Sequence, residues 1–151
     1  MDDAETPGAR ERGSVALVLR EARELDWLAG LVRRMPVWIL SSSHNDALAA
    51  RLRARWKLDE PSDAAGSKGS LTALPVFEGD SPRAQLIRAL CAIEAQDISS
   101  KSPYQRVMVH GAGLEECQSV AQQLTLFERV ESVGDAVVLQ RFARHAGAHS
   151  H

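Results

Sequence analysis

The feature that most constrains this chain is a fourfold alternation of short apolar runs with segments of helical periodicity. Such alternation predicts βαβ units, a mainly parallel sheet, and helices on both faces. The run Val37–Leu40 is continuously apolar, which is typical of a parallel strand covered on both sides. The expected strands lie within Ser14–Arg20, Val37–Leu40, Leu71–Gly79 and Gln105–Gly113. The expected helices lie within Glu21–Arg34, Ser43–Trp56, Asp80–Gln96 and Leu114–Leu124.

The pattern changes after the fourth helix. Two strand-like segments, FERVES and AVVLQRF, flank Gly134-Asp135, a pair suited to a tight reversal, so we expect an antiparallel β-hairpin. The predicted fold class is therefore α/β, a three-layer Rossmann-like or flavodoxin-like domain. Its mainly parallel sheet has about four strands, followed by the C-terminal hairpin. We expect one domain over residues 14–142, between a flexible arm (1–13) and a flexible tail (143–151).

Composition excludes several classes of function. The chain of 151 residues is 44% hydrophobic and 25% charged, as expected for a folded domain. Its net charge of −2 gives no general attraction to nucleic acid. No apolar run approaches the roughly 20 residues of a membrane helix, and the first 13 residues do not resemble a signal peptide. Cys91 and Cys117 match no metal or redox spacing; we expect both to be reduced and mostly buried, in a cytoplasmic protein.

Candidate site residues follow from the predicted topology. In parallel sheets ligands bind beyond the carboxyl ends of strands, and three of these ends carry polar residues. His44, Asp80 and His110 would lie along that edge, and each could act as a general acid or base. The sequence identifies no reaction, because it contains no Walker loop and no G-x-S-x-G elbow.

Two helix starts at the same edge could hold an anion. Gly111 and Gly113 allow positive φ and close backbone approach before a helix whose first N–H groups are free. Ser43 and Asn45 offer polar groups at another helix start. Each has a structural alternative: the glycines can form a tight turn, and Ser43 or Asn45 can cap the helix. Glu115 and its neighbour Glu116 would also repel a phosphate.

No metal site is predicted, and the sequence does not identify a cofactor. His145, His149 and His151 lie in the expected tail, and no set of three convergent ligands can be assigned. The helix after the second strand carries Arg55 and Trp56, residue types enriched at protein interfaces. We expect Trp56 to be partly exposed there.

The incomplete motifs favour a non-catalytic accessory or protein-interaction subunit. Its partner would be another protein or a second copy of the chain. The alternative is a small enzyme or ligand-binding protein that recognises a phosphorylated or nucleotide-like molecule at the carboxyl edge. A pocket that joins His44, Asp80 and His110 would favour this alternative, and separation of the three would favour the first hypothesis.

Overall fold

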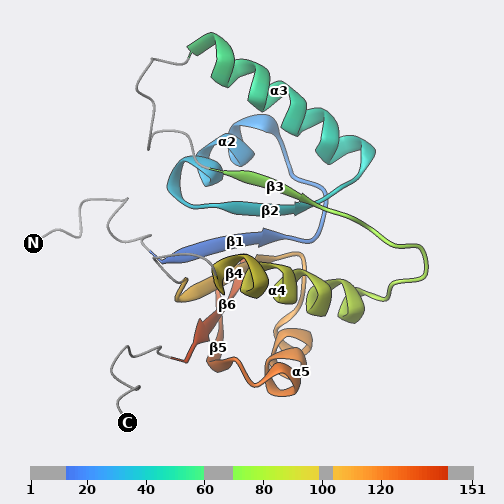
Figure 1. The fold of residues 1–151 in the computed structure, drawn as a ribbon, viewed down its shortest axis with the longest axis vertical. Coiled ribbons are helices and arrows are strands. Elements are labelled where there is room, and N and C mark those ends of the chain that lie inside the picture. Colours follow the sequence, from blue (N-terminus) through green and yellow to red (C-terminus); the bar gives the residue numbers. More distant parts are fainter. Residues whose placement is uncertain (1–12, 60–69, 99–103, 143–151) are drawn as a thin grey trace, which may run out of the picture.

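The computed structural model describes residues 13–59, 70–98 and 104–142. One mixed sheet of six strands runs through this part of the chain, in the order β3-β2-β1-β4-β6-β5 (Figure 1). Strands β1 to β4 are parallel to one another, and β6 pairs antiparallel with both β4 and β5. The strands are β1 (Ser14–Val18), β2 (Val37–Leu40), β3 (Leu71–Leu74), β4 (Arg106–His110), β5 (Phe127–Val133) and β6 (Ala136–Arg141).

Helices cover both faces of the sheet, which gives three layers. Helices α2 (Leu25–Arg34) and α3 (Ser43–Asp59) pack on one face. Helices α4 (Pro82–Ile98) and α5 (Leu114–Leu124) pack on the other. A hydrophobic core lies on each face of the sheet, and strand β1 is buried on both sides because its alternate residues pack into one core or the other. Val15 and Leu17 face α4 and α5, whereas Ala16 and Val18 face α2 and α3.

The main features of the predicted sheet are confirmed. Val37–Leu40 and Val107–Val109 lie in the two parallel neighbours of β1, and the C-terminal segments form an antiparallel hairpin. Gly134 has a φ of 60° in the two-residue turn, as the first central position of a type II′ turn requires. Pro75, within the expected third strand, lacks an N–H and so favours an edge position or a bulge for that strand; β3 does lie at one end of the sheet order.

Two predicted boundaries are wrong. The third strand ends at Leu74, because Pro75 supplies no N–H for a ladder, so residues 75–79 are a loop. The first helix begins at Leu25 and not at Glu21. Residues 19–24 instead form a loop at the carboxyl edge of the sheet, where backbone groups of this loop bond to β4 and α3.

The cysteine prediction holds for one residue and is wrong for the other. Cys117 is on the buried face of α5, and this burial raises the pKa of its thiol to about 11. Cys91 is exposed on α4, because it lies one position beyond the buried stripe that contains Leu90. Both are free thiols.

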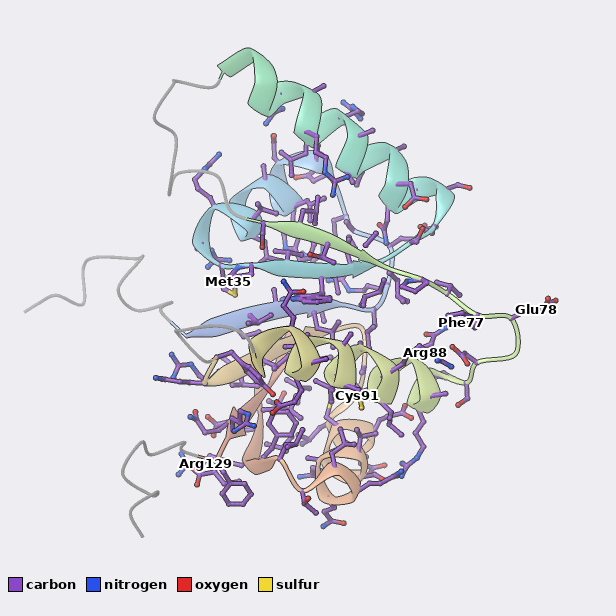
Figure 2. The ribbon with its side chains drawn as sticks, in the orientation of Figure 1. Met35, Phe77, Glu78, Arg88, Cys91 and Arg129 are labelled. Atoms are coloured by element: carbon purple, nitrogen blue, oxygen red, sulfur yellow. The ribbon has the colours of Figure 1, made fainter. Side chains whose placement is uncertain are left out.

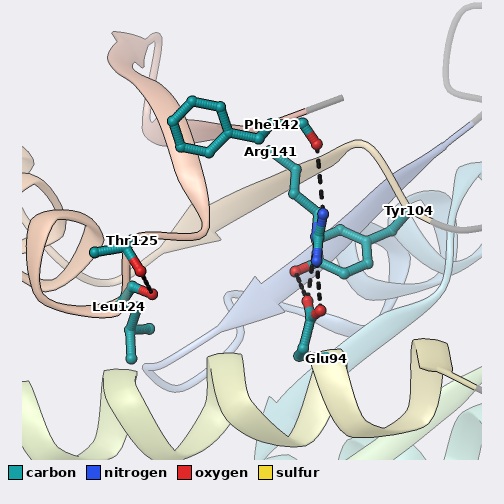
Figure 3. Close-up of polar contacts among 6 residues, drawn as sticks. All are labelled: Glu94, Tyr104, Leu124, Thr125, Arg141 and Phe142. Carbon is teal, nitrogen blue, oxygen red and sulfur yellow. Dashed lines mark hydrogen bonds and ion pairs between the residues drawn. The ribbon is translucent and has the colours of Figure 1, made fainter. Parts of the chain in front are cut away.

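A polar cluster joins α4 to the hairpin at the amino edge of the parallel strands (Figure 3). The Arg141 guanidinium donates to both carboxylate oxygens of Glu94, with Nη2 2.5 Å from Oε2. The Tyr104 hydroxyl donates to Glu94 Oε1 at 2.5 Å, and Arg141 lies 5.3 Å from the Tyr104 ring. Burial and the bond to Glu94 raise the pKa of Tyr104. The cluster fixes β6, and therefore the hairpin, against the helical layer.

Several predictions concern residues outside the described part of the chain. The arm over 1–13 and the tail over 143–151 belong here, apart from Gly13. So do the three C-terminal histidines and most of the linker between α3 and β3. The side chain of Trp56 is also not described, although its backbone lies in α3.

Candidate functional site

The four parallel strands end at one edge of the sheet, the carboxyl edge, where the loops after β1, β2, β3 and β4 meet. The hairpin turn reaches the same edge because β6 runs antiparallel to β4 and starts opposite the end of β4. Arg23 in the loop after β1 donates to Asp135 in this turn at 2.5 Å. The edge is therefore built from segments far apart in sequence.

Asn45 joins two of these loops. Its side chain is buried, and its Oδ1 accepts a hydrogen bond from Ala22 N at 2.8 Å. Its Nδ2 donates to Arg20 O at 3.1 Å and to Leu40 O at 2.8 Å. Asn45 was predicted as a helix cap or an anion ligand, but its amide is occupied by these three backbone groups.

The first turn of α3 is capped by Ser42, and neither Ser43 nor Asn45 is the cap. Ser42 Oγ accepts a hydrogen bond from Asn45 N at 3.0 Å, and Ser43 is exposed. The predicted helix start at Ser43 agrees with the structure, but the two predicted cap residues lie one and three positions after Ser42. A run of three serines offers three equivalent cap positions in sequence.

His44 lies beside an open groove between α2 and α3. Its Nε2 is 2.7 Å from Ala22 O, and a carbonyl can only accept, so this nitrogen carries the proton. The groove has a volume of about 500 Å³ and mixes basic and acidic side chains. Arg55, predicted as a partner contact, lines the same groove and lies 3.7 Å from Asp26. His44 and Arg55 are thus two predicted residues that the fold brings together.

Asp80 is held by Arg88, which lies nearly two turns into α4. Arg88 donates to both Asp80 oxygens, at 3.0 and 3.2 Å, while Ser81 caps the helix through Ala84 N. Asp80 borders a small, mainly apolar pocket of about 90 Å³ between β2, β3 and α4. The Arg88 guanidinium also lies 4.3 Å from the ring centroid of Phe77.

His110 is buried at the end of β4 on the α2 side of the sheet. Within the described residues, neither ring nitrogen has a hydrogen-bond partner. The ring instead meets Trp27 edge-on, with centroids 5.4 Å apart, and Arg20 lies 5.2 Å from the Trp27 ring. Burial lowers the pKa of His110, and the positive charge of Arg20 lowers it further. The imidazole is therefore neutral near pH 7.

This burial predicts a pH dependence of stability. Because the folded-state pKa of His110 lies below its ordinary value of 6.5, only the unfolded chain binds this proton just below pH 6.5. The contribution of His110 to the unfolding free energy is full above that pH and falls as the pH drops through it. In urea titrations, His110→Leu should weaken the loss of stability between about pH 7.5 and about pH 5.

The same variant should be more stable at neutral pH by roughly 1 kcal/mol, since a buried polar group without partners is removed. His44→Leu is the matched control, because that histidine is exposed and hydrogen-bonded. If the unfolding free energy of His110→Leu depended on pH as in the wild type, a lowered pKa of His110 in the folded protein would be contradicted.

The two glycines after β4 differ in their structural roles. Gly111 has a φ of 103°, and a Cβ there would lie 2.9 Å from the Leu19 carbonyl carbon. The loop after β1 packs this closely because Leu19 N donates to His110 O at 2.7 Å. Gly113 has a φ of −83°, and a Cβ there would meet nothing within 4 Å. The expectation of positive φ and close approach is thus confirmed for Gly111 and wrong for Gly113.

Gly113 is the residue before the first turn of α5, which has no side-chain cap. Glu115 and Glu116 place negative charge in that turn. The open space at Gly113 leaves room for a ligand, while the two carboxylates oppose an anionic one.

Neither of the two pockets described above joins the three predicted acid–base candidates. Asp80 borders the apolar pocket and His44 the groove, whereas His110 lines neither of them.

Sequence reasoning missed the exposed loop residues Val76 and Phe77 and their neighbour Arg88. The available signal was Pro75, since a strand that stops there leaves two apolar residues outside the sheet.

Within residues 13–59, 70–98 and 104–142, no group of three or more His, Cys, Asp or Glu side chains could hold a metal ion. The helices in the same ranges are all too short or too polar to span a bilayer. No protein-family model matches the chain, and no curated protein matches it in sequence.

Proposed function

We propose that this protein is a non-catalytic accessory or protein-interaction subunit built on a Rossmann-like fold. The order β3-β2-β1-β4 supports the Rossmann-like assignment, because the same order begins the doubly wound dinucleotide-binding fold. A cytoplasmic location is part of the proposal and is consistent with two free thiols. The observation that carries the functional proposal is an exposed apolar loop beside an apolar pocket.

The contact surface, called here the Phe77 surface, consists of Val76, Phe77, Arg88 and the adjoining pocket. Val76 and Phe77 are each 47% exposed, although both are large and apolar. Figure 2 shows Phe77 and Glu78 on the loop that projects beyond β3, with Arg88 behind them. An aromatic ring under an arginine beside an apolar recess is the composition of an interface hot spot.

The polar groups at the carboxyl edge support the same proposal. Asp80 is bonded to Arg88, His44 to a backbone oxygen, and Asn45 to three backbone groups. Groups that are occupied in this way position loops and are not poised for proton transfer to a substrate. The side chains of Asp80, His44 and Asn45 at the carboxyl edge are therefore held in hydrogen bonds, and this supports a contact surface over a reactive site.

The test is a binding experiment with Phe77→Ala. In native mass spectra of the protein purified from its own cells, the wild type is expected to carry a partner at a fixed ratio. Loss of a hot-spot aromatic costs about 2 kcal/mol or more of binding, so affinity should fall by about 30-fold. The melting temperature should change little, because half of the side chain is already exposed.

Phe142→Ala is the matched control. Phe142 is 49% exposed and lies just after β6, at the amino edge of the parallel strands. The Phe77 surface lies at their carboxyl edge (Figure 1). This variant should retain the partner. Equal loss of binding in both variants, or a partner that survives Phe77→Ala, would contradict a contact at the Phe77 surface.

The alternative function is recognition of a phosphorylated or nucleotide-like molecule. The open space at Gly113 and the unpartnered ring of His110 favour it. Calorimetric titration with inorganic phosphate, ADP and ATP tests it directly. If α5 holds an anion, Gly113→Ala should weaken binding without loss of stability, since a Cβ fits there. Absence of heat with all three compounds would exclude this class of ligand.

A further inference from the structure

The two edges of the sheet differ in their capacity to pair with another strand. The β3 edge is short and partly occupied. Ser70 O accepts a hydrogen bond from Val37 N of β2, and Leu74 O accepts one from Ser41 N just after β2. The carbonyl of Leu71, which follows Ser70, therefore points outward. Arg53 of α3 donates to that carbonyl at 2.8 Å. With Pro75 directly after the strand, the β3 edge is protected against pairing in the way that natural edges usually are.

The β5 edge is longer and, among the residues that the structure describes, no further strand pairs with it. Strand β5 has seven residues and ends the sheet order on the other side. Five of these residues are exposed: Glu128, Arg129, Glu131, Ser132 and Val133. Val133 is a large apolar residue with 48% of its surface exposed. A register shift between Phe127 and Arg129 places a bulge at Glu128, so the regular part of the edge is Arg129–Val133.

The charges on this edge alternate in sign on one face. Arg129 pairs in register with Gln140 and Glu131 with Val138, which puts both charged side chains on the side of the sheet away from α4 and α5. No salt bridge to Arg129 or Glu131 is found within the described residues. Figure 2 shows Arg129 at the β5 end of the sheet.

We infer that two copies of this chain pair antiparallel through β5, with Val130 on the two-fold axis. In this register Arg129 of each protomer lies directly opposite Glu131 of the other, and the pair occurs twice. Opposite charges directly across a strand pair stabilise the pairing, whereas like charges oppose it. A two-fold axis at Arg129 or at Glu131 would place identical charges together. The edge is therefore self-complementary in the Val130 register.

The result would be one continuous sheet across two protomers, with helices on the same faces in both. Pairing through β5 leaves the Phe77 surface free, because that surface adjoins β3 at the far end of the sheet. The inference thus goes beyond the proposed function and does not depend on it. Phe77→Ala should leave the dimer intact.

Charge exchange tests the interface. Sedimentation velocity of the wild type should give a concentration-dependent dimer. Arg129→Glu and Glu131→Arg should each weaken it at least 10-fold, because each places like charges opposite one another twice. The double variant Arg129→Glu/Glu131→Arg restores both pairs with reversed signs and should recover the dimer. Both side chains are exposed, so circular dichroism should show an unchanged fold.

Arg33→Glu is the matched control, since it makes the same charge change at an exposed site on α2. It should leave dimerisation unchanged. A wild type that stays monomeric up to its solubility limit would overturn the inference. A double variant no better than the single variants would also overturn it.

Disulfide trapping tests the register, in a Cys91→Ser background to remove the exposed thiol. Directly opposed residues in an antiparallel pair have Cα atoms about 4.5–5.5 Å apart, within the range of a disulfide. Val130→Cys should therefore cross-link to its own copy under mild oxidation. Ser132→Cys should not, since the two copies of residue 132 would be four positions apart, roughly 13 Å. Faster cross-linking at residue 132 would overturn the Val130 register.

Discussion

Replacement of Asn45 by alanine is expected to lower the free energy of unfolding by at least about 3 kcal/mol, the largest effect of any polar substitution at the carboxyl edge. The change leaves three backbone groups without their partner: Ala22 N, Arg20 O and Leu40 O. Each buried polar group that loses its partner costs roughly 1–3 kcal/mol. Urea unfolding followed by tryptophan fluorescence measures the difference.

The neighbouring serines provide a graded control. Ser42→Ala removes the helix cap and should cost about 1 kcal/mol. Ser43→Ala changes an exposed residue and should stay within about 0.5 kcal/mol of the wild type. A cost of Ser43→Ala as large as that of Asn45→Ala would show that the helix start is built differently from this description.

The second large effect is expected at Glu94. Glu94→Ala leaves the Arg141 guanidinium, whose side chain is only 10% exposed, without its carboxylate. Removal of one partner of a buried ion pair costs about 3–5 kcal/mol, because the other charge stays buried and unpaired. The Tyr104 hydroxyl loses its acceptor in the same variant. Chemical denaturation at neutral pH measures the loss.

Two comparisons isolate the cause. The double variant Glu94→Leu/Arg141→Met removes both charges and should recover most of the lost stability. Arg23→Ala breaks an ion pair of the same 2.5 Å distance, but its side chains are 56% and 62% exposed. That change should cost only about 0–1 kcal/mol. If the double variant were as unstable as Glu94→Ala, lost packing would be the cause and not the unpaired charge.

The proposed contacts lie at opposite ends of one sheet. The Phe77 surface adjoins β3, and the self-complementary edge is β5. A dimer through β5 would present two Phe77 surfaces, one on each distal end of the joined sheet. A partner with two binding sites could then engage both, and its apparent affinity would exceed that of a single contact.

Local patterns in the sequence were sufficient to predict the helices and strands. They also predicted which strands pair in parallel and which pair antiparallel. A continuous apolar run such as Val37–Leu40 is typical of a strand covered by helices on both faces, so a parallel sheet was expected and is found. The hairpin followed from Gly134-Asp135, because a two-residue reversal with a positive φ needs such a pair. The missing N–H of Pro75 favoured an edge position or a bulge for the third strand, and β3 is found at an edge.

The sequence by itself thus determined the layers, the hairpin and the edge at which polar residues gather, since each depends on residues close together in the chain. Only the tertiary structure decided what those residues do. Asn45 bonds to groups more than 20 positions away, and Arg23 meets Asp135 across 112 positions. His110, at the end of β4, is buried against Trp27 of α2, and its ring nitrogens have no hydrogen-bond partner among the described residues. Contacts between residues so distant in sequence depend on how the helices pack on the sheet. No local sequence pattern encodes that packing.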